Sequence, residues 1–534
     1  MVFFKRYIIL LLLCFGCKKT APNVVIEKTA IDSSKIPTPQ IVKDDERTIP
    51  IDTSKLKSFH SQLLWNFYRS SNYETVWSSF KKRQFVLNQI QNSENYGLNA
   101  SDYNFKKLQN LENNIVKLND DELIQYDVML TGSFQKFLNH LYKGKLNPKE
   151  LYTDWDLKPK DFNVNQVLID AFNKDDLNKA LTESQPKTAT YQQLLKALHI
   201  INTFPEDKTV RITGVEKIVL NDTTAELIKI KKKLQYWHDL SQQEPLNTIY
   251  SWETLDAVKK FQTRHGLHAD GVIGKGTIWA LNHSKEERRQ QIIANLERWR
   301  WYNAVLENDY VIVNIPNYSL HVVEQNDTVL NRNVVVGSSN RKTPILSSTL
   351  KTIVFNPTWT VPPTIIKEDI TAAMKKNRNY TAKKNITILN ANGDTVAPAN
   401  WNENNPLAYR YVQKPGKNNS LGLMKILFPN SHSVYLHDTN HRNLFGRQNR
   451  SLSSGCVRIE NPLELAQHLL NDETKWSAEI IDSIIVSEKT KAIPITKKYD
   501  LFQWYWTAWS HNNQLQFRRD IYNLDAELYR KLRN

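Results

Sequence analysis

The spacing of apolar residues along this chain changes from a helical period to a strand-like period after Trp301. Before that point apolar residues recur every three or four positions, as in 63–69, 80–90 and 126–142, which predicts amphipathic helices. A chain of 534 residues is also too long for a single core. After Trp301 the pattern alternates or is β-branched and predicts strands at 310–315, 319–324, 328–336, 352–355, 424–428 and 433–436. We therefore predict a multidomain α+β protein with a helical N-terminal half and a mainly β C-terminal domain.

The N-terminus predicts export. Lys5 and Arg6 precede an apolar run that ends at Gly16-Cys17, the form of a secretory signal peptide. The next residues mix Pro, Ser, Lys and Asp without a period, which predicts a disordered tether. The predicted ranges are a signal peptide at 1–17, the tether at 18–50, a helical domain at 51–215, a second helical unit at 222–285, a β domain at 308–488 and a C-terminal hairpin and tail at 495–534.

Local signals refine these ranges. The second helical unit should contain a helix that ends at His265-Gly266, where glycine caps readily, and a short helix that begins near Thr277. Asn461-Pro462 should cap a helix at 463–470. The tail should form a hairpin from 502–509 and 515–522 around a turn at 511–513.

A long insertion at 366–421 interrupts the β domain. It is rich in Lys and Asn, with a helical signal at 367–376. Inserts of this length are either lids over a site or disordered excursions. We expect a partly ordered lid, and a surface excursion that touches nothing in the site is the alternative.

The net charge of +16, from 71 basic and 55 acidic residues, suits an anionic polymer or surface. The excess is spread along the chain and forms no basic arm. Nucleic acid is therefore not an expected partner.

Cys456 is the only cysteine beyond the first twenty residues. A nucleophilic thiol needs a base and N–H groups that receive an oxyanion. His437 ends an apolar run 19 residues earlier (456 minus 437), and Ser454-Gly455 lets the backbone approach a reacting carbonyl. Arg458 follows directly and can hold a carboxylate with two hydrogen bonds. The pattern predicts a Cys/His acyl-transfer site.

Three other interpretations remain open. A lone cysteine is often a small buried apolar residue. His432, His437 and His441 with a thiol could bind metal, although intervals of five and four residues do not match a usual zinc pattern. The basic residues around the cysteine could form an ordinary solvated face; they are Arg442, Arg447, Arg450 and Arg458.

The segment from His437-Asp438-Thr439 through Leu444-Phe445-Gly446 to Ser453-Ser454-Gly455-Cys456-Val457-Arg458 resembles the signature of the L,D-transpeptidases. These are YkuD-type cysteine enzymes that crosslink peptidoglycan, and the variant is similar to the large Gram-negative members. The resemblance implies Cys456 as the acylated nucleophile and His437 as general base. It also implies that Asp438 contributes its main chain, and Ser454 stands where many members have histidine.

Other segments extend the resemblance. The run Phe261–Gly274 resembles a three-helix peptidoglycan-binding domain, with a purely structural spacer as the alternative. Tyr142-Lys143-Gly144 and Asp154-Trp155 are similar to motifs of the scaffold domain in the large subgroup. The helix at 296–301, the insertion and the aromatic tail are also similar to that subgroup.

The signal peptide resembles that of a lipoprotein, with cleavage before Cys17 and lipidation of its sulfur; an uncleaved or conventionally cleaved signal is the alternative. Cys456 would then be the sole free thiol of the mature chain, and an unpaired thiol in an oxidising compartment is a liability unless it is used. The resemblance implies a membrane-anchored lipoprotein in a Gram-negative periplasm.

The function implied is L,D-transpeptidation that makes 3→3 crosslinks through a Cys456 thioester. N–H groups near Gly455 and Cys456 would hold the oxyanion, and Arg458 would orient the donor. The expected partners are peptidoglycan stem peptides and glycan, with no cofactor and no metal. The alternatives are a hydrolase on the same fold and a non-catalytic peptidoglycan-binding lipoprotein.

Overall fold

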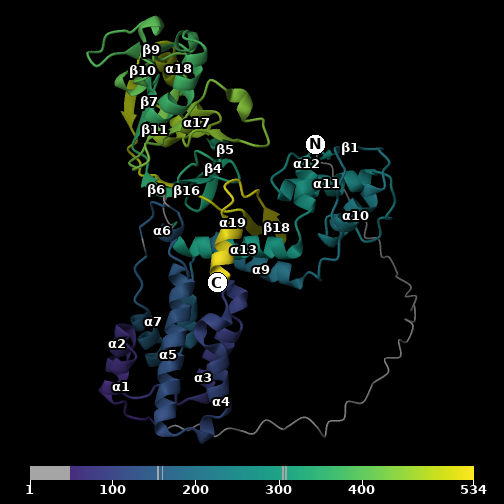
Figure 1. Cartoon of the computed structure of the whole chain (residues 1–534), viewed down its shortest axis with the longest axis vertical. Coiled ribbons are helices and arrows are strands. Elements are labelled where there is room, and N and C mark those ends of the chain that lie inside the picture. Colours follow the sequence, from purple (N-terminus) through teal and green to yellow (C-terminus); the bar gives the residue numbers. More distant parts are fainter. Residues whose placement is uncertain (1–47, 153–154, 159, 303–305, 307–308) are drawn as a thin grey trace, which may run out of the picture. The chain divides into compact units, whose positions relative to one another are not determined.

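The computed structural model describes residues 48–534 except 153–154, 159, 303–305 and 307–308 (Figure 1). The predicted signal peptide, Cys17, nearly all of the tether and Asp154 lie outside these residues. By their contacts, the described residues belong to one compact unit. Among the described residues no helix is both long and apolar enough to cross a membrane.

The N-terminal helices pack around a core of their own, which runs from Ile51 to Leu181. The long helix α5 starts with a capping box formed by Asn119 and Glu122. Its buried Asp127 accepts hydrogen bonds from Tyr68 Oη and from two main-chain N–H groups, and so ties the neighbouring segments to α5. The helices are α1 (Thr53–Ser58), α2 (Gln62–Ser70), α3 (Phe80–Gln91), α4 (Phe105–Asn113), α5 (Asp120–Lys143), α6 (Pro148–Leu151), α7 (Val164–Asn173) and α8 (Leu177–Glu183).

Helix α9 (Ala189–Thr203) belongs to a different core. Its apolar residues join a cluster that includes α13 (Lys285–Trp301) and the C-terminal β domain. The most extensive contacts of α9 are with α13 and with β17 (Ala508–His511). The range predicted as one helical domain, 51–215, therefore contains helices that belong to two different hydrophobic cores.

A small helical unit precedes α13. It consists of α10 (Glu226–Tyr236), α11 (Trp252–Arg264) and α12 (Lys275–Leu281), with β1 (Lys217–Ile218) paired to β2 (Ile273–Gly274). The prediction that α11 ends at His265-Gly266 is confirmed, whereas α12 begins two residues before Thr277. The buried amide of Gln262 holds the following turn by accepting from Gly271 N and donating to Val272 O, both at 2.9 Å.

The C-terminal domain is built on an eleven-stranded sheet with the order β15-β7-β11-β12-β14-β5-β4-β3-β16-β6, and β13 pairs with β5. Strands β4 and β7 have the predicted bounds. The strands are β3 (Tyr310–Asn314), β4 (Ser319–Glu324), β5 (Asp327–Gly337), β6 (Leu346–Thr349), β7 (Thr352–Phe355), β11 (Met424–Leu427), β12 (Leu436–His437), β13 (Ser451–Ser453), β14 (Val457–Ile459), β15 (Lys491–Pro494) and β16 (Asp500–Trp504).

The predicted strand at 433–436 is wrong for its first three residues. Ser433 has a left-handed φ of +55°. The Asn430 side chain accepts hydrogen bonds from His432 N (3.0 Å) and Val434 N (3.1 Å), which stabilises a turn in place of a strand. Strand β12 therefore begins at Leu436, just before His437.

Two predictions near the C-terminus also need correction. Helix α17 (Pro462–Leu470) begins at Pro462, but Asn461 has a φ of +47° and makes no side-chain cap. Residues 502–504 belong to β16, which lies between β3 and β6 in the main sheet. The hairpin is shorter than predicted and pairs β17 with β18 (Gln514–Phe517); α19 (Asp525–Arg533) follows it.

The insertion forms a packed subdomain together with residues 359–365, which precede its predicted start. Its core includes Ile366, Met374 and Tyr411, and Trp401 Nε1 donates to Tyr411 Oη at 2.6 Å. A three-stranded sheet has the order β8-β10-β9. The elements are β8 (Trp359–Thr360), α14 (Pro363–Ile365), a π-helical turn (Ile366–Ile370), α15 (Thr371–Lys376), α16 (Tyr380–Lys383), β9 (Ile386–Leu389) and β10 (Arg410–Gln413).

Candidate active site

Three neighbouring strands place the predicted catalytic residues on one face of the sheet. His437 on β12 is the cross-strand partner of Lys425 on β11 and of Arg458 on β14. Cys456 directly precedes β14, and the alternation of side chains, carried back two residues from Arg458, turns it to the same side. Leu436, Val457 and Ile459 face the other way and are buried in the core. Burial of this apolar face therefore orients the polar face toward the site.

The polar face lines a cavity of about 1150 Å³. Five of the residues predicted from sequence lie on its wall: His437, Ser454, Gly455, Cys456 and Arg458. Asp438 does not line it. Helix α14 and the insertion supply much of the remaining wall, the insertion through the π-helical turn and α16, so the excursion that touches nothing in the site is excluded.

The environment of the Cys456/His437 pair favours the neutral form of both groups. Burial raises the pKa of the Cys456 thiol, while the Tyr435 main chain and the charges of Arg458 and Lys425 act to lower it. Burial, followed by the charge of Arg458, lowers the pKa of His437 to about 3, and main-chain groups of Asp438 and Leu421 oppose that shift. At neutral pH His437 is therefore an unprotonated imidazole that can accept the thiol proton.

The carboxylate of Asp438 holds a turn beside the site. It accepts hydrogen bonds from Leu423 N (2.8 Å) and from Arg442 Nη2 (2.7 Å). A β carbon at Gly422, where φ is +64°, would lie 2.3 Å from Asp438 Oδ2, so this close approach requires glycine. The turn presents the main chain of Leu421 to the His437 ring.

Hydrogen bonds also order the loop that carries Cys456. Gly455, with φ of +112°, accepts at its carbonyl from Thr343 Oγ1 (2.9 Å). Its N–H donates to Ser453 Oγ (3.1 Å), which donates in turn to the Cys456 carbonyl (2.5 Å). The Gly455 N–H is therefore engaged, contrary to the expected oxyanion role. The Cys456 N–H has no acceptor among the described residues.

Arg341 joins the Cys456 loop to the insertion. Its guanidinium donates to Ser454 Oγ (2.9 Å), to Asp369 and to Glu368. The sequence did not single out Arg341, because it lies in a loop after β5 with no nearby motif. Lys425 was also missed. Its sequence context could have indicated it, because a lysine stands between two apolar residues of a predicted strand. Those residues, Met424 and Ile426, are both fully buried.

The metal interpretation is not supported by the geometry. His432 and His441 line the same cavity as His437. Over residues 48–534, gaps aside, no group of three or more His, Cys, Asp or Glu side chains is arranged to hold a metal ion. His432 Nε2 instead lies 3.7 Å from Asp156 Oδ2.

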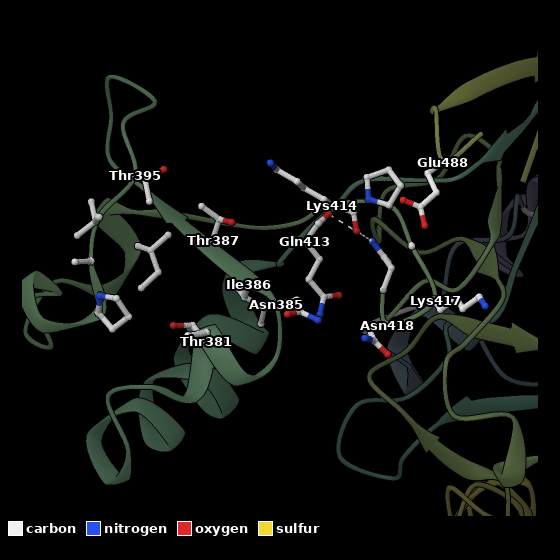
Figure 2. Close-up of a pocket in the computed structure, with 18 residues that line it drawn as sticks. Thr381, Asn385, Ile386, Thr387, Thr395, Gln413, Lys414, Lys417, Asn418 and Glu488 are labelled. Atoms are coloured by element: carbon white, nitrogen blue, oxygen red, sulfur yellow. Dashed lines mark hydrogen bonds between the residues drawn. The ribbon is translucent and has the colours of Figure 1, made fainter. Parts of the chain in front are cut away.

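A second cavity of about 700 Å³ adjoins the first (Figure 2). Asn385, Ile386, Gln413 and Asn418 line both cavities and form the wall between them. Gln413 holds this wall together, because its side chain donates to Lys384 O (2.7 Å) and accepts from Ser420 N (2.8 Å). Figure 2 shows Thr387 and Thr395 on one side of the second cavity, with Lys417 and Glu488 on the other.

Three families match separate parts of the chain. Residues 62–198 match a scaffold domain, residues 223–281 match a domain described as "Putative peptidoglycan binding domain", and residues 308–486 match the L,D-transpeptidase catalytic domain. A curated relative from Haemophilus influenzae, described as "Putative L,D-transpeptidase", is 39% identical over 294 residues, 54% of this chain. The chain spans 58% of the length of that relative.

Solved structures with similarity to the chain include two L,D-transpeptidases. The one from Stackebrandtia nassauensis is 15% identical, covers 48% of this chain and 91% of its own, and has a TM-score of 0.21. The one from Xylanimonas cellulosilytica is 13% identical, covers 55% and 99%, and has a TM-score of 0.18. These scores are low, and no feature of the fold is inferred from them.

Proposed function

We propose that the protein crosslinks peptidoglycan stem peptides, because residues 308–486 match an L,D-transpeptidase catalytic domain and other parts of the chain match a scaffold domain and a peptidoglycan-binding domain. The observation that carries this proposal is the placement of Cys456 and His437 on one sheet face in one cavity. Export to the periplasm and lipid anchoring at Cys17 are part of the proposal and rest on the resemblance of the N-terminus.

In the first half-reaction the Cys456 sulfur attacks the carbonyl at the L-centre of the diamino acid in a tetrapeptide stem. His437 accepts the thiol proton, and the oxyanion receives a hydrogen bond from the Cys456 N–H. The imidazolium then returns the proton to the amine of the terminal D-alanine as it leaves. The product is a thioester between the stem and Cys456.

In the second half-reaction the side-chain amine of another stem attacks the thioester. His437 removes a proton from the attacking amine, and the thiol is regenerated as the 3→3 amide bond forms. Water in place of the amine would give hydrolysis. The insertion lines the cavity that holds Cys456, and as a lid it would exclude water at this step.

Arg458 is suited to orient the donor. Its Nε is buried and has no hydrogen-bond partner among the described residues, and its side chain lines the cavity. A buried guanidinium without a partner favours an anionic ligand. We assign to it a carboxylate of the donor stem.

Incubation of the purified protein with disaccharide-tetrapeptides, followed by mass spectrometry, tests the proposal. Dimers that have lost one D-alanine per crosslink support it. Trimmed stems without dimers would identify a hydrolase. No change in the peptides, with Cys456 unmodified, would indicate a non-catalytic peptidoglycan-binding protein.

A further inference from the structure

Lys425 lies close to the Cys456/His437 pair and has no role in the reaction described so far. It is the direct cross-strand partner of His437, so its side chain starts on the same face of the sheet. Its Nζ lies 5.5 Å from the centroid of the Tyr435 ring. Tyr435 and Cys456 directly precede the adjacent strands β12 and β14, and the Tyr435 carbonyl accepts a hydrogen bond from Val457 N.

The charges around Cys456 are mainly positive. Arg458 on β14 and Lys425 on β11 flank the pair, and neither has an ion-pair partner among the described residues. The carboxylates on the cavity wall, Glu368 and Asp369, are both bound to Arg341.

The remaining titratable groups on the cavity wall do not reverse this balance. Lys342, Lys383 and Lys384 add positive charge. Burial lowers the pKa of His441, so its imidazole adds little positive charge. Asp438, behind the site, is bound to Arg442.

We propose that Lys425 is a positioning residue of the transfer reaction, whose ammonium stabilises the negative charge on the Cys456 sulfur as the proton passes to His437. This inference rests on the proposed function and extends it. Lys425 lies one strand from His437 and two strands from the strand that Cys456 precedes, and a positive charge there favours a thiolate and disfavours an imidazolium. Burial lowers the pKa of Lys425 and the charge of Cys456 raises it, the reciprocal of the effect of Lys425 on the thiol.

The pH profile of Cys456 alkylation by iodoacetamide, measured on the full chain, tests the proposal without any substrate. In Lys425→Met the midpoint should rise by about one pH unit, so that the alkylation rate near neutral pH falls about tenfold. Lys425→Arg should restore the wild-type midpoint, because it keeps the charge. A merely structural role for the side chain would not be rescued in this way.

Lys491→Met is the matched control. Lys491 lies on β15 of the same sheet, with its Nζ 5.4 Å from the Trp476 ring centroid, and its cross-strand partner is Phe355 rather than a residue of the site. Its profile should equal that of the wild type. Equal midpoints for Lys425→Met and the wild type, or equal shifts in Lys425→Met and Lys491→Met, would overturn the proposal. If Lys425→Met does not fold, Lys425→Gln provides the same neutral comparison.

The two proposals fail separately. If stem peptides never acylate wild-type Cys456, the proposed function fails, yet the alkylation profiles still decide whether Lys425 stabilises the thiolate. If acylation occurs but the profiles coincide, only the role of Lys425 is lost.

Discussion

Arg341 binds Asp369 through two hydrogen bonds, Nη1 to Oδ2 at 2.7 Å and Nη2 to Oδ1 at 2.9 Å. Arg341 follows a strand of the main sheet, whereas Asp369 belongs to the insertion. The same guanidinium donates to Ser454, two residues before Cys456. The pair therefore holds the insertion against the loop of the nucleophile.

Replacing Glu368 with Gln and Asp369 with Asn together should loosen this contact, while Arg341 keeps its hydrogen bond to Ser454. Both carboxylates are about half exposed, so the loss is only about 0.5–1 kcal/mol. The ratio of hydrolysed to crosslinked product should rise about two- to fivefold, with acylation of Cys456 preserved. Glu403→Gln, which breaks the Arg378–Glu403 pair within the insertion, is the control. An unchanged product ratio in the double variant would contradict the lid.

Cys456→Ala and His437→Ala should each reduce stem-peptide acylation by about a thousandfold or more, because a nucleophile and its base act as one unit. Cys456→Ala should keep its melting temperature, since one small side chain replaces another. Product analysis and thermal melting check both points. Crosslinking by folded Cys456→Ala would show that another nucleophile operates.

Gly422→Ala should lower the unfolding free energy by more than the strain of its backbone angle alone. The new β carbon would meet Asp438 Oδ2 at 2.3 Å, in addition to the strain of φ +64°. We expect a loss of about 2–3 kcal/mol in unfolding free energy and reduced acylation. Gly393→Ala is the matched control, because φ is +90° and nothing lies within 4 Å. Equal losses in urea unfolding would show that the contact with Asp438 is unimportant.

The acid limb of the acylation rate should lie well below the ordinary histidine range. The pKa of His437 is lowered from 6.5 to about 3, so the base stays unprotonated as pH falls through 6.5. A rate that halves near pH 6.5 would contradict this. Thermal melting at each pH provides the control.

Acidification should also lower stability. Between pH 6.5 and about 3 the unfolded chain binds a proton at His437 that the folded chain does not, so the unfolding free energy falls as pH falls. His140 and His283, with pKa values lowered to about 4, act in the same direction. A melting temperature that rises on acidification through this window would contradict the buried, neutral state of these histidines.

Lipidation at Cys17 predicts that the protein partitions with membranes and that Cys17→Ser releases it. Fractionation of cells that express either form checks this. Wild-type protein in the soluble periplasmic fraction would contradict the anchor, with the Cys456→Ala protein as a control for effects of thiol loss.

Local sequence patterns were sufficient for several elements, and they also led to the proposed nucleophile. Strands β4 and β7 could be predicted to the residue, because alternation along a strand is a property of neighbouring positions. Cys456 and His437 could be named as a pair because their chemistry depends on residue type. The Asn430 turn, by contrast, shortened β12 through side-chain hydrogen bonds that apolar spacing does not encode.

The sequence by itself determined a helical half, a β half and a Cys/His pair within one short segment. Only the tertiary structure decided which distant residues surround that pair. Lys425 is a neighbour of His437 because β11 pairs with β12, and Arg341 reaches Asp369 because the insertion packs over the loop after β5. Periodicity is set by adjacent residues, whereas strand pairing and ion pairing depend on which buried faces fit together, and no local pattern records that choice.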